Sequence, residues 1–386
     1  MIHPRPPRMR RHGTHRARRS TRHDNRFPWA AVVLLPVCLA VAAIGGTEPL
    51  RGDGNPRPAQ WSLTALRVSQ AWQWSRGAGV TVAVLDTGAD PAHPDLAGAV
   101  VPGPDLTGPN LTGRDLAGTY LTGPDLTGAA FAPGRWGKHG SAMASLIAGR
   151  GRGTGRLPGV LGVAPEATIL SIKVTEESGA PHREAPRTPA APPAEGRNAL
   201  ADGIRHAADL GARVISMSLG GGHRSAEGSP SEAAAVRYAI ARGAVLVASS
   251  GNDGANGNRR HYPAAYPGVI AVGAVDEQLR VAPFSNGQDY VSVMAPGTRI
   301  LAAAGGDSYT VGDGTSSAAA LVAGIAALIT AEFPALSPAQ VREAIEGSAT
   351  RRPPGPSPPA GIADAGLALR LASHLAEQPL PNRPAA

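Results

Sequence analysis

The chain has 386 residues, of which 42% are hydrophobic, 17% charged and only 4% aromatic, with 49 Gly, 37 Pro and one Cys. This composition excludes a largely disordered chain and predicts a sizeable core of small aliphatic side chains. The net charge is +8, but nine of the 37 basic and one of the 29 acidic residues lie in residues 1–26, so the remainder, with 28 of each, is neutral. Nucleic-acid binding by the folded body therefore has no electrostatic support.

The first 46 residues have the layout of an export signal. An Arg-rich start runs into an apolar stretch, residues 28–46, which ends in small residues typical of a cleavage site. The same stretch approaches membrane-spanning length, so an uncleaved anchor at the cell surface stays open beside secretion. Cys38 is the only cysteine and lies in this segment, so we expect no internal disulfide and no thiolate metal site in the mature chain.

From residue 60 onward, short apolar runs alternate with helix-like runs. The strand candidates are residues 80–85, 168–174, 213–217, 244–248 and 269–275, and the helix candidates are residues 141–148, 198–210, 231–242, 316–333 and 338–346. The strand candidates are almost continuous in Val, Ile and Leu, as expected for strands buried on both faces. We predict one α/β domain over residues 60–372, with a mostly parallel central sheet, helices on both faces, and ligand chemistry at the carboxyl ends of the strands.

Four segments stand outside this alternation. Residues 104–128 are five copies of a five-residue unit with Leu at its centre and Gly at its end, an insertion that is either a repetitive surface loop or a short solenoid-like flap. Residues 176–197, rich in Pro, Ala and charge, predict a solvated loop. Residues 47–59 form a short segment before the core, and residues 373–386 form a polar tail.

Three polar residues stand at Gly-marked ends of predicted elements. Asp86 ends a strand in VAVLDTG, His139 precedes an Ala-rich helix in KHGSAMASL, and Ser316 opens a helix in GTSSAAALVAG. These residue types support acyl transfer, in which the Ser attacks, the His moves its proton and the Asp orients the His. Each also has an ordinary structural role, such as helix N-capping for Ser316.

Two other hydrolase classes fit parts of this pattern. VLDTG also begins an aspartic protease, but that chemistry needs two carboxylates that share a proton, and the chain has no second DTG or DSG. An α/β-hydrolase with Ser316, Asp364 and His374 needs a strand directly before the nucleophile, where residues 305–314 are Gly-rich and loop-like. We therefore favour neither class.

Asn252 follows a predicted buried strand in the turn ASSGNDG. A side-chain amide at this place can donate to the oxyanion of an acyl-transfer intermediate. The same residues also favour an ordinary turn, so Asn252 alone does not decide between the two roles.

The segments around Asp86, His139, Asn252 and Ser316 together resemble the motifs of the subtilisin-like serine proteases, the subtilases of peptidase family S8. The motifs occur in the family's order Asp, His, Asn, Ser. The resemblance covers about residues 60–371 and implies a subtilisin-like three-layer α/β fold and a secreted serine endopeptidase. It implies that Ser316 is the nucleophile, His139 the general base and then acid, and Asp86 the group that orients His139. Asn252 and the Ser316 N–H would form the oxyanion hole. The short pre-core segment resembles the mycosin group associated with type VII secretion, although we expect no C-terminal membrane helix of the kind usual there, because no second apolar run of 18 or more residues occurs.

The resemblance also assigns a substrate groove. SMSLGG is similar to the family's exposed strand, which pairs with an extended peptide, and two further segments are similar to the wall and floor of the pocket for P1, the residue before the scissile bond. The residues so assigned are Ser218, Leu219, Gly220 and Gly221 on the strand, Ala248, Ser249 and Gly251 on the wall, and His261 on the floor. We expect His261 to narrow the pocket and to favour small or polar P1 side chains.

The proposed chemistry requires no cofactor or metal. Asp95, in HPDL, matches a calcium-ligand position of subtilisins, but the partner loop GRGRGTGRLPG carries three Arg and lacks the Asn or Asp expected there, so tight binding of a structural calcium ion is not expected. The expected partners are protein or peptide substrates, and we expect a monomer that meets a membrane only through its N-terminal segment. The alternative function is a catalytically silent secreted binding or scaffold protein on the same fold.

Overall fold

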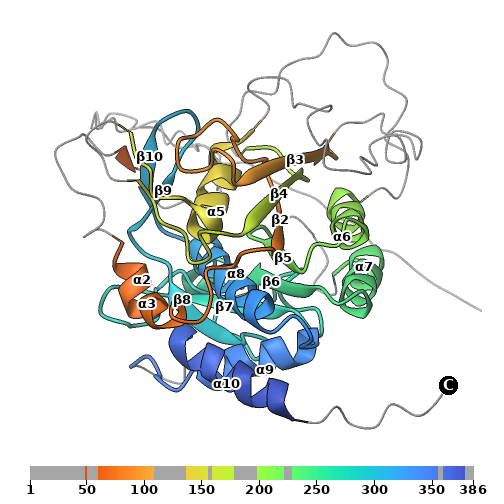
Figure 1. Ribbon diagram of the computed structural model, residues 1–386, viewed down its shortest axis with the longest axis vertical. Helices are drawn as coiled ribbons and strands as arrows, with labels where there is room; N and C mark the ends of the chain where they lie inside the picture. Colours follow the sequence, from red (N-terminus) through yellow and green to blue (C-terminus); the bar gives the residue numbers. More distant parts are fainter. Residues whose placement is uncertain are drawn as a thin grey trace, which may run out of the picture. The chain divides into compact units, whose positions relative to one another are not determined.

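The central sheet has seven strands in the order β3-β4-β2-β5-β6-β7-β8. The computed structural model describes residues 48–49, 60–107, 136–154, 159–177, 198–220, 228–354 and 360–378. The strands are β2 (Thr81–Asp86), β3 (Val100–Asp105), β4 (Thr168–Lys173), β5 (Val214–Met217), β6 (Val245–Ser249), β7 (Ile270–Val275) and β8 (Val293–Pro296). Every pairing between neighbours is parallel, which confirms the predicted mostly parallel sheet (Figure 1).

A second, antiparallel sheet contains β1 (Glu48–Pro49), β10 (Tyr309–Gly312) and β9 (Ile300–Ala303), in that order. Glu48 is paired with Val311, so the segment predicted to precede the core contributes a two-residue strand. These short strands carry no long apolar run, which is why the sequence analysis did not find them.

Helices cover both faces of the central sheet. They are α2 (Trp61–Ala65), α3 (Val68–Ala71), α5 (Lys138–Ala148), α6 (Ala199–Asp209), α7 (Pro230–Ala241), α8 (Thr315–Glu332), α9 (Pro338–Ser348) and α10 (Ala365–Glu377), with a short 3-10 turn η1 (Gly254–Asn256). The five predicted helices and five predicted strands all occur, and their ends fall within three residues of the predicted ends.

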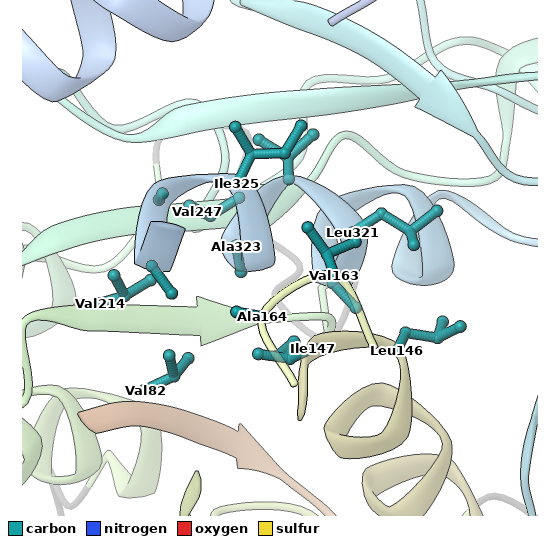
Figure 2. Packing of buried hydrophobic residues seen from close by; sticks show 14 of the residues in the cluster. Val82, Leu146, Ile147, Val163, Ala164, Val214, Val247, Leu321, Ala323 and Ile325 are labelled. Atoms are coloured by element: carbon teal, nitrogen blue, oxygen red, sulfur yellow. The ribbon is translucent and has the colours of Figure 1, made fainter. Parts of the chain in front are cut away.

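The sheet separates two hydrophobic clusters because side chains alternate along a strand. In β2, Val82 and Val84 point into the cluster that includes α5, α8, α9 and α10, whereas Ala83 and Leu85 point into the cluster that includes α6 and α7. Figure 1 shows α6 and α7 together on one side, and Figure 2 shows α8 packed on the strands on the other. Burial on both faces explains the continuous Val, Ile and Leu content of these strands.

Helix α8 passes through the centre of the first cluster. Within the described ranges it is the one helix long and apolar enough to cross a membrane, but 83% of that window is buried inside the protein. Its Leu321, Ala323 and Ile325 belong to one buried cluster with Val82 of β2, Val214 of β5 and Val247 of β6, which makes it a core helix (Figure 2). The predicted export segment, residues 1–46, lies outside the described residues.

Two predicted boundaries differ from the structure. Strand β3 contains Pro102 and Pro104 and ends at Asp105, inside the first unit of the predicted 104–128 insertion; it tolerates proline because it is an edge strand. Helix α10 continues to Glu377, so the fold extends five residues into the predicted polar tail, because Leu375 still packs on the core. Most of the five-residue repeats and of the Pro-rich loop lie outside the described residues.

Candidate active site

The carboxyl edge of the central sheet carries the side chains that the sequence analysis singled out. Asp86 is the last residue of β2, Ser218 directly follows β5, and Asn252 lies three residues beyond β6. The starts of two helices reach the same edge, because His139 is the second residue of α5 and Ser316 is the second residue of α8. The predicted location of the chemistry at the strand ends thus agrees with the fold.

Asp86 and His139 are in direct contact. The Nδ1 atom of His139 lies 2.7 Å from Oδ1 of Asp86, which also accepts a hydrogen bond from the Thr87 N–H at 2.7 Å. Asp86 is only 1% exposed, while the His139 side chain is 37% exposed. A carboxylate can only accept here, so Nδ1 carries the proton and Nε2 is left as the basic nitrogen.

The surroundings of His139 favour its protonated form. Burial lowers the pKa of His139, but the charge of Asp86, its hydrogen bond and the charge of Glu177 raise it more, so the pKa lies above the ordinary 6.5. The raised pKa makes His139 a stronger base than an ordinary imidazole, which favours its acceptance of a proton from a hydroxyl.

The helix that carries His139 is held close to β2 by a glycine. A Cβ on Gly140 would lie 2.2 Å from the carbonyl oxygen of Gly88, so only glycine allows this approach of α5 to the turn after Asp86. The Gly140 N–H donates to Oγ1 of Thr87 at 3.0 Å, which satisfies one of the free donors of the first helical turn. Thr87 and Gly140 therefore fix the distance between Asp86 and His139.

Ser316 contacts the predicted substrate strand in this conformation. Its Oγ donates to the carbonyl oxygen of Ser218 at 3.1 Å, and Oγ of Ser218 donates to the carbonyl oxygen of Ser316 at 2.9 Å. Among the hydrogen bonds of the described residues, the hydroxyl of Ser316 is thus on Ser218, not on His139. The structure brings Asp86 and His139 into contact, whereas no hydrogen bond between Ser316 and His139 is found among the described residues.

Asn252 is oriented by the residue before Ser316. Its Oδ1 accepts hydrogen bonds from the backbone N–H of Thr315 at 2.9 Å and from Oγ1 of Thr315 at 2.8 Å. Because Oδ1 is held by Thr315, the two N–H donors on Nδ2 point away from the Thr315 N–H and hydroxyl. Nδ2 would lie 3.6 Å from a Cβ built on Gly314. This fixed amide is of the kind that stabilises an oxyanion.

The predicted substrate groove follows the ends of β5 and β6. Ser218 is buried, Leu219 half-buried and Gly220 exposed directly after β5, while Gly221 lies outside the described residues. Ala248 and Ser249 are the last two residues of β6 and are both buried. Pairing of this segment with an extended peptide stays a prediction.

His261 fills the space between these two segments. A Cβ on Gly251, whose φ is +110°, would lie 2.7 Å from Cγ of His261, and a Cβ on Gly220 would lie 3.5 Å from its Nδ1. The ring is 15% exposed and is therefore closely packed against both segments. That His261 limits the size of the P1 side chain stays a prediction, and its place between these two segments is the observation on which the prediction depends.

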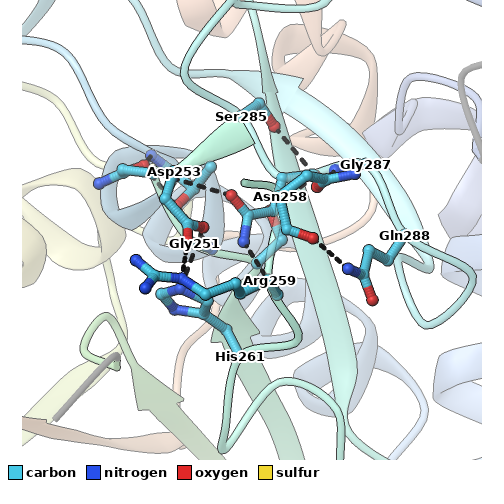
Figure 3. Close-up of polar contacts among 12 residues, drawn as sticks. Gly251, Asp253, Asn258, Arg259, His261, Ser285, Gly287 and Gln288 are labelled. Carbon is cyan, nitrogen blue, oxygen red and sulfur yellow. Dashed lines mark hydrogen bonds and ion pairs between the residues drawn. The ribbon is translucent and has the colours of Figure 1, made fainter. Parts of the chain in front are cut away.

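A polar cluster holds His261 in place, as Figure 3 shows. Nε2 of His261 lies 3.1 Å from Oδ1 of Asp253 as an ion-pair contact without hydrogen-bond alignment, and Nε of Arg259 lies 2.8 Å from Oδ2. Asn286 accepts from the Asp253 N–H at 2.9 Å. Burial raises the pKa of Asp253, but the hydrogen bonds from Arg259 and Asn286 and the charge of His261 lower it further, so it stays ionised at neutral pH.

The calcium-ligand position predicted from the resemblance is occupied by protein donors. Asp95 is fully buried, and its Oδ1 accepts from the Gly153 N–H at 2.8 Å, while Oδ2 accepts from the Val160 N–H at 2.7 Å and from the Tyr309 hydroxyl at 2.9 Å. Burial and the Asp95 carboxylate raise the pKa of Tyr309, so it remains a donor. These residues do not fit a calcium ion, and within the described ranges no group of three or more His, Cys, Asp or Glu can hold a metal.

Four residues of the site were not found by the sequence analysis. Thr87 and Thr315 are neighbours of motif residues and orient His139 and Asn252 through backbone and hydroxyl contacts. Asp253 supports His261, and Glu177 accepts the His139 N–H from the edge of the Pro-rich segment. Thr87, Thr315 and Asp253 lie beside the motifs, which is a usable signal, whereas nothing in the local sequence marks Glu177.

Comparison with known proteins identifies the family. The subtilase family matches residues 77–363. Thermitase from Thermoactinomyces vulgaris is 33% identical over 292 residues, which cover 76% of this chain and 88% of thermitase, and subtilisin DY from Bacillus licheniformis is 35% identical over 281 residues, covering 72% and 86%. The solved structure of the mycosin MycP3, a protease from the type VII (ESX-3) secretion system, matches with a TM-score of 0.61 at 33% identity and covers 84% of this chain and 91% of that chain. The chain therefore belongs to the subtilase family of serine proteases.

Proposed function

We propose that the chain is an exported endopeptidase that hydrolyses peptide bonds through an acyl-enzyme on Ser316. The observation that carries this proposal is the 2.7 Å contact between His139 and the buried Asp86, which leaves Nε2 of His139 as the base at the strand edge where α8 presents Ser316. Membership of the subtilase family supports the same reaction class.

The reaction needs only these side chains and a water molecule. The Ser316 hydroxyl leaves the Ser218 carbonyl by rotation about its Cα–Cβ bond, gives its proton to Nε2 of His139 and attacks the substrate carbonyl carbon. The amide of Asn252 and the Ser316 N–H donate to the oxyanion that forms. His139 then protonates the leaving amine, and water repeats the sequence on the acyl-enzyme and releases the acid.

The proposed substrate is an extended protein or peptide segment. It adds as a strand beside Ser218, Leu219 and Gly220, with its P1 side chain between that strand and the end of β6. Because His261 occupies the floor of this space, small or polar P1 residues are preferred. We further propose that residues 1–46 direct export of the chain, with a retained N-terminal membrane anchor as the alternative. The proposed oligomeric state is a monomer.

Labelling with a fluorophosphonate probe tests this function directly. We expect one covalent adduct per molecule by intact mass, lost in Ser316→Ala and retained in Ser317→Ala, which removes the neighbouring buried hydroxyl. Failure of the folded protein to form any adduct would overturn the proposal in favour of a catalytically silent binding protein. An adduct that persists in Ser316→Ala would show that another residue is the nucleophile.

A further inference from the structure

Glu177 contacts the helix that carries the general base. It lies four residues after the end of β4, and its Oε2 accepts a hydrogen bond from the backbone N–H of His139 at 3.2 Å. The adjacent Glu176 points elsewhere, because it accepts from Nζ of Lys173 at 2.8 Å and from Oγ1 of Thr107 at 3.0 Å. Two neighbouring acids thus have different surroundings.

Helix α5 lacks a cap of its own. Its N-cap is Gly137, which has no side chain to accept from the first-turn N–H groups. Glu177 takes the N–H of His139 and Thr87 takes that of Gly140, so two residues far away in sequence supply the cap. A Cβ on Gly137 would lie 2.4 Å from Oε2 of Glu177 and 2.0 Å from Oγ1 of Thr87, so the glycine leaves room for both.

The charge of Glu177 also bears on the imidazole. His139 lies in the first turn of α5, where the partial positive charge of the helix end disfavours an imidazolium ion. The charged groups near it are Asp86 from β2, Glu177 from the end of β4 and the exposed Lys138 on α5 itself. Asp86 and Glu177 are the two that favour the imidazolium.

We propose that Glu177 is a positioning residue for the general base: its carboxylate caps α5 and stabilises the imidazolium that His139 becomes during acylation. This role rests on the function proposed above, in which His139 takes the proton of Ser316. Glu177 does not touch the substrate in this role and acts through His139.

The imidazole of His139 can be titrated by NMR in Ser316→Ala protein, which needs no activity. Adding Glu177→Gln should lower the pKa of His139 by roughly 0.5 pH unit, since one nearby negative charge is lost while the amide oxygen can still accept the His139 N–H. Adding Glu176→Gln, the matched control, should leave it unchanged. An unchanged pKa in Glu177→Gln, or an equal shift in Glu176→Gln, overturns the proposal.

The active chain supplies a second readout. The acid limb of the pH profile of kcat/KM should move to lower pH by the same amount in Glu177→Gln and stay in place in Glu176→Gln, because the base loses its proton at lower pH. If the Gln variant fails to fold, Glu177→Asp and Glu177→Asn repeat the comparison. These two side chains have the same length, one methylene shorter than Glu, and differ from each other in charge. Inactivity of the wild type would reject the proposed function, whereas the NMR shift still decides the role of Glu177.

Discussion

Ser316 and Ser218 exchange two hydrogen bonds, one from each hydroxyl to the carbonyl oxygen of the other residue, at 3.1 and 2.9 Å. The acceptor for Ser316 belongs to the strand that we expect to pair with the substrate. A peptide N–H that pairs with this carbonyl would compete with the Ser316 hydroxyl and free it to turn toward His139. We therefore expect substrate binding and release of the Ser316 hydroxyl to be linked through the Ser218 carbonyl oxygen.

Ser218→Ala tests the second of these hydrogen bonds, in which the Ser218 hydroxyl donates to the Ser316 carbonyl oxygen. It removes the hydrogen bond to the Ser316 carbonyl, worth about 0.5–1.5 kcal/mol, so kcat/KM for a peptide substrate should fall roughly 2- to 10-fold. The measurement is steady-state kinetics beside Ser69→Ala, an exposed serine on α3 that should have no effect. A Ser218→Ala enzyme as fast as the wild type would show that this bond does not position Ser316.

Asn252→Ala should lower kcat by about 10²–10³-fold with little change in KM, because the amide acts on the oxyanion and not on the bound substrate. Thr315→Val should cause a smaller loss, since it removes the 2.8 Å hydroxyl bond to Oδ1 and keeps the backbone bond. A large rise in KM with kcat intact would contradict the role assigned to Asn252.

His261→Ala should widen the P1 pocket. For the wild type we expect faster hydrolysis of substrates with Ala or Ser at P1 than with Phe. In the variant, kcat/KM for Phe relative to Ala should rise by roughly 10-fold or more, as the ring between Gly220 and Gly251 is removed. Arg260→Ala is the control because Arg260 pairs with Asp289 and not with His261. A strong preference of the wild type for Phe would reject this assignment.

Asp95→Asn should lower the free energy of unfolding by about 1.5–3 kcal/mol, because it disturbs hydrogen bonds from three donors to one buried carboxylate. Guanidinium unfolding measures this loss, with the exposed Asp307→Asn as control. Excess EDTA should not shift the melting temperature of the wild type, since the carboxylate is satisfied by protein donors. A fall in melting temperature that calcium restores would place a calcium ion elsewhere in the chain.

Much of the fold could be predicted from the sequence because the buried strands are short apolar runs rich in Val, Ile and Leu. Strand β3 was missed because it contains two prolines, and β8 because its four residues include Pro296 and no clear run. Helix α10 was not among the predicted helices: residues 365–372 were placed in the domain without a helix, and residues 373–377 were read as part of the polar tail although Leu375 packs on the core. These elements depend on tertiary contacts more than on local pattern.

The candidate site divides in the same way. The sequence by itself placed Asp86, His139 and Ser316 within three residues of the end of β2 and the starts of α5 and α8, because apolar runs and glycines mark these ends; α5 begins three residues earlier than predicted and includes His139. Only the tertiary structure decided the hydrogen-bond partners. Glu177 accepts from the N–H of His139, 38 residues away, and the Tyr309 hydroxyl donates to the Asp95 carboxylate, 214 residues away. The Ser316 hydroxyl donates to the Ser218 carbonyl oxygen. The physical reason is that each such contact depends on the path of the whole chain, which brings together donors and acceptors that no local pattern connects.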